Sequence, residues 1–93
     1  FPAVDRDVAL VMDESQPVGP VLAAIRRAGG QLMEKAEMFD VYRDARLGAN
    51  KKSVAFSMRF RSADHTLTDE EISKAFDKVV RGCEHQFHAE IRK

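Results

Sequence analysis

The segment at residues 51–61 constrains the fold of this chain more than any other part of the sequence. Its apolar residues alternate without interruption with polar or small ones. The apolar set is Val54, Phe56, Met58 and Phe60, and the other set is Ser53, Ala55, Ser57, Arg59 and Arg61. Successive side chains of a β-strand point to opposite faces, so this alternation predicts a strand with one buried face and one open face.

Three further strands are expected, at residues 4–12, 31–43 and roughly 88–92. In the second of these we expect Phe39 and Val41 to face the core, because they alternate with Asp40 and Tyr42. Residues 44–50 contain glycine and asparagine and are predicted to form a hairpin loop. If Tyr42 pairs with Ser53 across this hairpin, Asp40 pairs with the alanine at position 55.

Two helices are expected between the strands. Ser15 is the predicted N-cap of the first helix, with Pro17 in its first turn, and Gly29-Gly30 is its predicted end. Thr68 and Glu71 have the spacing of a capping box at the start of the second helix. The apolar stripes are Val18, Val21, Leu22 and Ile25 on the first helix and Ile72, Ala75, Phe76, Val79 and Cys83 on the second.

The resulting order, strand–helix–strand–strand–helix–strand, is that of the ferredoxin-like α+β fold. Right-handed crossovers place both helices on one face of a four-stranded antiparallel sheet and leave the other face open. A chain of 93 residues fits one domain, here residues 1–93. Because it begins with Phe1 instead of methionine, we expect it to be a piece of a longer chain.

Overall composition excludes little. Fifteen basic residues balance fifteen acidic ones, so net charge favours no partner. No apolar run approaches the ~20 residues of a membrane span, and no secretory signal is recognisable. The lone Cys83 cannot form an internal disulfide and fits a cytoplasmic protein. It lies on an apolar stripe, so a structural thiol is favoured over a nucleophile. Cys83, His85 and His88 are close enough to suggest a metal site, but His88 lies past the predicted helix end and no fourth ligand is evident, so no metal is expected.

The predicted open face carries one aromatic residue, Tyr42, with Asp40, Ser53 and Ala9 nearby. A base could stack on this ring while its edge hydrogen-bonds to the carboxylate and the hydroxyl, the usual way in which single-stranded RNA is read on a sheet. A carboxylate only accepts hydrogen bonds and so favours the adjacent donors of guanine. An exposed tyrosine is equally an ordinary strand residue, and this alternative stays open at the level of the residues alone.

Positive charge gathers around the hairpin. Residues 43–61 hold six basic side chains and one acidic one; the candidates for phosphate contacts are Arg59, Arg61, Lys51 and Lys52. The alternative is a solvated hairpin whose charges prevent edge aggregation.

Five segments resemble, in order, the motifs of the ferredoxin-fold anticodon-binding domain that closes the β subunit of bacterial phenylalanine–tRNA ligases. They are Phe1-Pro2 and residues 6–10, 39–43, 51–56 and 66–72. The resemblance implies that Tyr42 and Asp40 hold the first anticodon base, a guanine, and that Ser53 and Ala9 complete its pocket. It also implies a non-catalytic, cofactor-free domain of a cytoplasmic enzyme that uses ATP and Mg²⁺. The implied partners are tRNA(Phe), the rest of the β subunit and the α subunit of a heterotetramer.

Two other classes of function compete with RNA binding. An acylphosphatase-like enzyme would need an arginine in a phosphate loop after the first strand, where residues 12–15 offer acid instead. A ferredoxin-like regulatory or dimerisation module would pair through a sheet edge or through the open face, and pairing through the open face would cover Tyr42.

Overall fold

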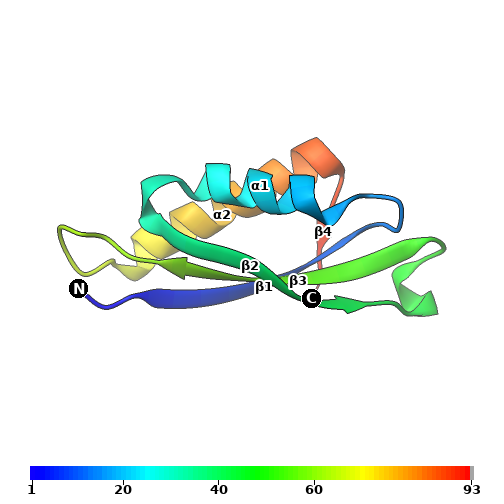
Figure 1. Ribbon diagram of the computed structural model, residues 1–93, viewed down its shortest axis with the longest axis horizontal. Coiled ribbons are helices and arrows are strands. Elements are labelled where there is room, and N and C mark those ends of the chain that lie inside the picture. Colours follow the sequence, from blue (N-terminus) through cyan, green and yellow to red (C-terminus); the bar gives the residue numbers. More distant parts are fainter. Residues whose placement is uncertain (93) are drawn as a thin grey trace.

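The strands and helices follow one another in the predicted order (Figure 1). The structure is a computed structural model that describes residues 1–92. Its elements are β1 (Val4–Asp13), α1 (Val18–Gly29), β2 (Met33–Tyr42), β3 (Lys51–Phe60), α2 (Asp69–Phe87) and β4 (Glu90–Ile91). Short 3₁₀ turns, Gly30–Leu32 and Ala45–Leu47, precede β2 and β3. The ferredoxin-like α+β prediction is therefore confirmed.

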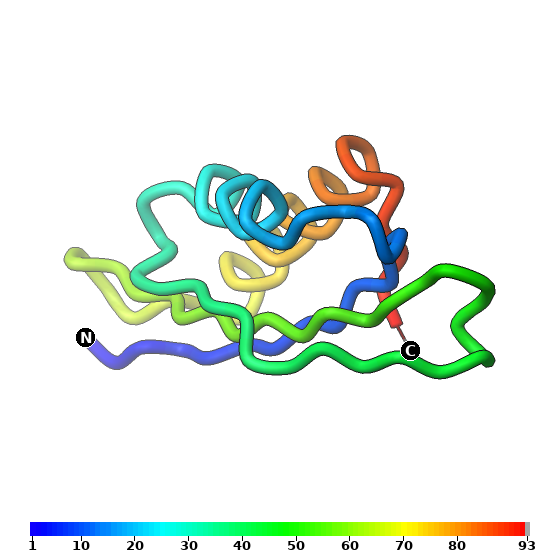
Figure 2. Tube along the Cα trace, turned by 45° about the vertical axis from the view of Figure 1, so that its right-hand side comes forward, coloured from blue at the N-terminus to red at the C-terminus, as the bar shows by residue number. Residues whose placement is uncertain are grey.

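The sheet is antiparallel, with strand order β2-β3-β1-β4, so β2 and β4 form its edges. Both helices lie on one face, as Figure 2 shows from a second direction, and no element covers the other face within the described chain. The molecule is elongated, 45 × 19 × 19 Å, because the three long strands run along its main axis.

The core lies between the helices and the inner face of the sheet. The alternation along β3 is realised as predicted: Val54, Phe56 and Phe60 have no exposed surface, and Met58 is 1% exposed. From α2, Ile72 and Val79 reach the same core. Burying these side chains supplies the main driving force for folding.

The start of α2 is confirmed and the start of α1 is not. Thr68 accepts from the backbone N–H of Glu71, whose carboxylate accepts from the N–H of Thr68, which completes a capping box. By contrast, α1 has Pro17 as its N-cap, without a side-chain hydrogen bond, and Ser15 lies in the preceding turn. A residue before proline is held out of the helical region. Gln16 therefore cannot be the first helical residue that a Ser15 cap requires.

An irregularity in β2 overturns one sequence prediction. The pairing with β3 slips between Met38 and Asp40, so that Phe39 is the extra residue of a bulge. Phe39 is 56% exposed instead of facing the helices. Ala36, earlier in the strand, is buried, and after the bulge Val41 packs against the core. The alternation of side chains in the sequence could not reveal the bulge, because it assumes that each residue of β2 faces a single residue of β3.

Two features of the helices bear on function classes. Within residues 1–92 no helix combines the length and the apolar character needed to cross a bilayer. Cys83 on α2 is a buried free thiol, and burial raises its pKa.

Candidate nucleic-acid interface

The outer face of the sheet brings the four predicted base-binding residues into two adjacent rows. Tyr42 on β2 lies opposite Ser53 on β3, and Asp40 lies opposite Ala55, which in turn lies opposite Ala9 on β1. The predicted hairpin register is thus confirmed. It depends on the bulge: because a one-residue slip reverses every side chain of a strand, an unbulged β2 could not keep Ala36 inside and these residues outside.

The ring of Tyr42 is fixed through its hydroxyl. The hydroxyl donates to Asp44 Oδ2 at 2.9 Å, and it accepts from Arg46 Nη2 at 3.4 Å. Asp44 caps the 3₁₀ turn by accepting from the backbone N–H of Arg46 at 2.8 Å. The bonds from Arg46, and then the one from Tyr42, lower the pKa of Asp44 to about 2. The loop that joins β2 to β3 therefore holds the hydroxyl of the only aromatic side chain in these two rows.

A residue that sequence reasoning missed lies over this ring. The guanidinium carbon of Arg92 is 4.4 Å from the centre of the Tyr42 ring, a cation–π distance. Arg92 directly follows β4 at the far edge of the sheet, and its backbone N–H donates to Ala9 O at 2.8 Å. No sequence spacing relates positions 42 and 92; only the strand order brings them together.

Asp40 and Ser53 differ in accessibility. Asp40 is exposed, and its carboxylate takes no hydrogen bond or ion pair within residues 1–92, so it is free to accept from a ligand. Ser53 is 2% exposed although it lies on the outer face. A base edge can reach its hydroxyl only after neighbouring side chains move.

The basic side chains near the hairpin are engaged by acids. The pairs are Arg43–Glu14, Arg46–Asp44, Lys51–Asp13, Lys52–Glu14, Arg59–Asp5 and Arg61–Glu34. Their charge is therefore largely balanced locally and does not form a bare positive patch. Exposed pairs of this kind contribute little stability, about 0–1 kcal/mol, so a phosphate can displace the acid at small cost.

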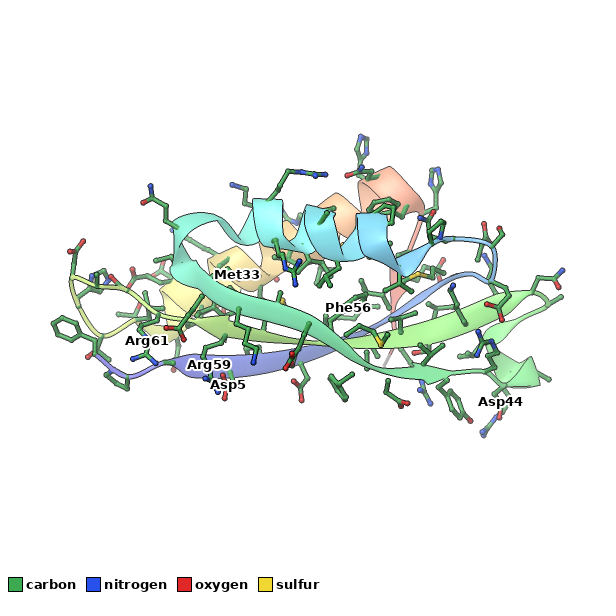
Figure 3. All side chains as sticks on the ribbon, viewed as in Figure 1. Asp5, Met33, Asp44, Phe56, Arg59 and Arg61 are labelled. Atoms are coloured by element: carbon green, nitrogen blue, oxygen red, sulfur yellow. The ribbon has the colours of Figure 1, made fainter. Side chains whose placement is uncertain are left out.

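Arg59 and Arg61 lie away from the base-binding rows. Arg59 Nε is 2.9 Å from Asp5 Oδ1, and Arg61 Nε is 2.9 Å from Glu34 Oε1. Figure 3 shows both arginines and Asp5 toward one end of the sheet and Asp44 at the other end. Arg59 is six positions along β3 from Ser53, about 20 Å at the rise of a strand. These arginines can reach only nucleotides distant from a base at Tyr42.

Lys52 does not lie where a phosphate contact would require it. It shares the phase of the core residues of β3 and is 7% exposed. Its ammonium group donates to Glu14 O at 3.0 Å and to Gln16 O at 2.8 Å, and so fastens the turn between β1 and α1. Buried groups hydrogen-bonded in this way hold structure, so we retain only Lys51 and the two arginines as candidates for phosphate contacts.

Comparisons with known proteins show what the chain is similar to. The family model of the ferredoxin-fold anticodon binding domain matches residues 1–92. Over 92 residues, 99% of this chain, it is 49% identical to the phenylalanine–tRNA ligase beta subunit of Corynebacterium glutamicum and covers 11% of that protein. The corresponding subunits of Clostridium tetani and Bacillus subtilis are 46% and 40% identical over the same share of the chain, which covers 12% and 11% of them. The chain thus spans about a ninth of the length of these relatives.

Proposed function

The chain belongs to the ferredoxin-fold anticodon-binding domain family, and from this premise we propose that it binds the anticodon of tRNA(Phe) as one domain of a phenylalanine–tRNA ligase β subunit. It holds the first anticodon base, a guanine, on the outer face of the sheet. Catalysis, with ATP and Mg²⁺, belongs to the rest of that enzyme and its α subunit, in the cytoplasm.

The observation that carries the proposal is the register of β2 on β3. It gathers a ring, a free carboxylate, a hydroxyl and two alanines within two rows: Tyr42, Asp40, Ser53, Ala55 and Ala9. The small residues leave room for a base beside the ring. This is the combination by which single-stranded RNA is recognised on open sheets, a stacking platform together with groups that bond to the base edge.

Asp40 supplies the preference for guanine. An ionised carboxylate has only acceptors, and guanine is the base that presents two adjacent donors, N1–H and N2–H₂. Asp40 is exposed and has no competing partner within the described chain. A two-bond contact of this type contributes about 1–3 kcal/mol of discrimination between bases.

The domain alone binds RNA weakly. One stacked base contributes about 1–3 kcal/mol, whereas micromolar affinity needs about 8 kcal/mol. The remainder comes from other parts of the ligase, which hold the tRNA near the domain at high effective concentration. Lys51, Arg59 and Arg61 add phosphate contacts by exchanging their carboxylate partners.

The test compares Tyr42→Ala and Asp40→Asn in the complete ligase. Tyr42→Ala lowers tRNA affinity about 5- to 150-fold and leaves ATP-dependent activation of phenylalanine unchanged, because activation does not involve the anticodon. Asp40→Asn relaxes discrimination between tRNAs with guanine and with adenine at the first anticodon position. Asp7→Asn is the matched control, since Asp7 is also exposed on β1, opposite Ser57. Normal charging of both tRNAs by both variants would refute the proposal.

A further inference from the structure

The base-binding surface is closed in the free protein. The Arg92 guanidinium lies 4.4 Å from the centre of the Tyr42 ring, on a face that a base would use for stacking. Ser53, the residue opposite Tyr42 in the register, is 2% exposed. A base that stacks on this face of Tyr42 must therefore first displace the Arg92 side chain.

The Arg92 side chain is free to move while its backbone is held. The backbone N–H of Arg92 donates to Ala9 O at 2.8 Å, next to the two β1–β4 pairs Leu10–Ile91 and Val11–Glu90. Its side chain is exposed and takes no hydrogen bond or ion pair within residues 1–92. Stacked bases are spaced by about 3.4 Å, so the guanidinium has to withdraw by only that amount to admit one base. A long, exposed side chain that is held by the ring contact and by the charge of Asp44, and not by a hydrogen bond within residues 1–92, accommodates this shift.

We propose that Arg92 is a base-contacting residue, a lid that opens from Tyr42 and closes on the outer side of the bound base. The base is then held between a phenol ring and a guanidinium plane. Both groups are known stacking partners of unpaired bases, and guanidinium keeps its charge and planarity at any physiological pH. The inference rests on the proposed function, because it needs a base at Tyr42.

Two other roles for Arg92 make different predictions. If Arg92 only blocks access of a base to the Tyr42 ring, its removal strengthens the binding of RNA. If it contacts a phosphate, its removal weakens binding of RNA whether or not a base is present. A lid that stacks on the base weakens binding only when the base is there, by about two- to fivefold for an exposed cation–π contact.

The composition of the chain provides a direct optical probe. Tyr42 is the single tyrosine and there is no tryptophan, so the tyrosine emission of the 93-residue chain reports on this site alone. The chain has its own hydrophobic core, formed between both helices and the sheet. We would titrate it to millimolar concentration with a uridine-flanked RNA pentamer that carries guanine at its centre, and with the same pentamer lacking that base.

Three variants complete the experiment: Arg92→Ala, Arg92→Lys and the control Arg27→Ala, an equal loss of charge from an exposed position on α1. We expect Arg92→Ala and Arg92→Lys to weaken binding of the guanine pentamer about two- to fivefold, with no effect on the abasic pentamer. Arg27→Ala should bind both as the parent chain does. Thermal unfolding of each variant confirms that it is folded.

Each contrary result is informative. Tighter or unchanged binding by Arg92→Ala overturns the lid, as does equal weakening for both pentamers or full activity of Arg92→Lys. These results leave the proposed function intact, because the parent chain still binds through Tyr42. If millimolar guanine pentamer leaves the emission of the parent chain unchanged, both the lid and the proposed function are refuted.

Discussion

Replacing Phe39 by alanine should cost far less stability than replacing Phe56, although both are phenylalanines of neighbouring strands. Phe56 has no exposed surface, and truncating such a ring costs about 3–5 kcal/mol. Phe39 is 56% exposed. Complete burial of a phenylalanine contributes about 1.5–3 kcal/mol, so the minor buried part of Phe39 contributes about 1 kcal/mol or less.

Thermal unfolding, followed by far-ultraviolet circular dichroism, measures the difference. In a domain of this size each kcal/mol shifts the midpoint by about 4–8 °C. Phe39→Ala should therefore lower Tm by at most about 8 °C. Phe56→Ala should lower it by more than about 12 °C or leave the chain unfolded, because a small domain has only about 5–15 kcal/mol in total.

Equal destabilisation by the two variants would refute the bulge. Phe39 would then be packed in the core, and Asp40 would no longer lie opposite Ala55 in the pairing of β2 with β3. The consequence would extend to the interface, since the same bulge keeps Asp40 and Tyr42 on the outer face. A stability measurement therefore tests the geometry on which base recognition depends.

Three further outcomes are expected. Lys52→Met keeps the aliphatic stem but leaves two backbone carbonyls without their charged donor, so it should lower the free energy of unfolding in urea by about 1–3 kcal/mol. Lys51→Ala removes only an exposed ion pair and should change the free energy of unfolding by no more than about 0.5 kcal/mol. Thr68→Ala removes half of the capping box and should cost about 0.5–2 kcal/mol in the same assay. The folded-state pKa of Asp44 is lowered from 3.8 to about 2, so its stabilising contribution is present above pH 4 and is lost as pH falls through 2. The emission of Tyr42 should change around pH 2, where the folded carboxylate takes up its proton, and in Asp44→Asn it should not.

Local regularity explains what could be predicted from the sequence. The β3 pattern survives because residues 53–60 of that strand are paired on both sides, with β1 and with β2. The capping box of Thr68 and Glu71 is likewise a local arrangement, and its geometry follows from residues three apart. The hairpin register, Tyr42 with Ser53, agrees with the prediction because residues 40–42 of β2 pair one to one with residues 53–55 of β3.

The predictions that failed depend on interactions beyond a local pattern. Phe39 is exposed because β2 is an edge strand that can bulge, and an apolar residue gives no sign of this in the sequence. Ser15 does not cap α1, because Pro17 holds the residue before it out of the helical region. Arg92 could be found only once the sheet order was known, because the last strand lies beside the first.

The bulged edge has a consequence for how the molecule behaves at high concentration. A flat edge strand offers unpaired backbone groups to a second copy and so promotes sheet-to-sheet association. Here β2 is interrupted twice, between Met33 and Lys35 and between Met38 and Asp40. The opposite edge, β4, is only two residues long. The β2 edge therefore presents no long regular ladder, so this open sheet, with an exposed phenylalanine on that rim, resists growing into a fibril through β2.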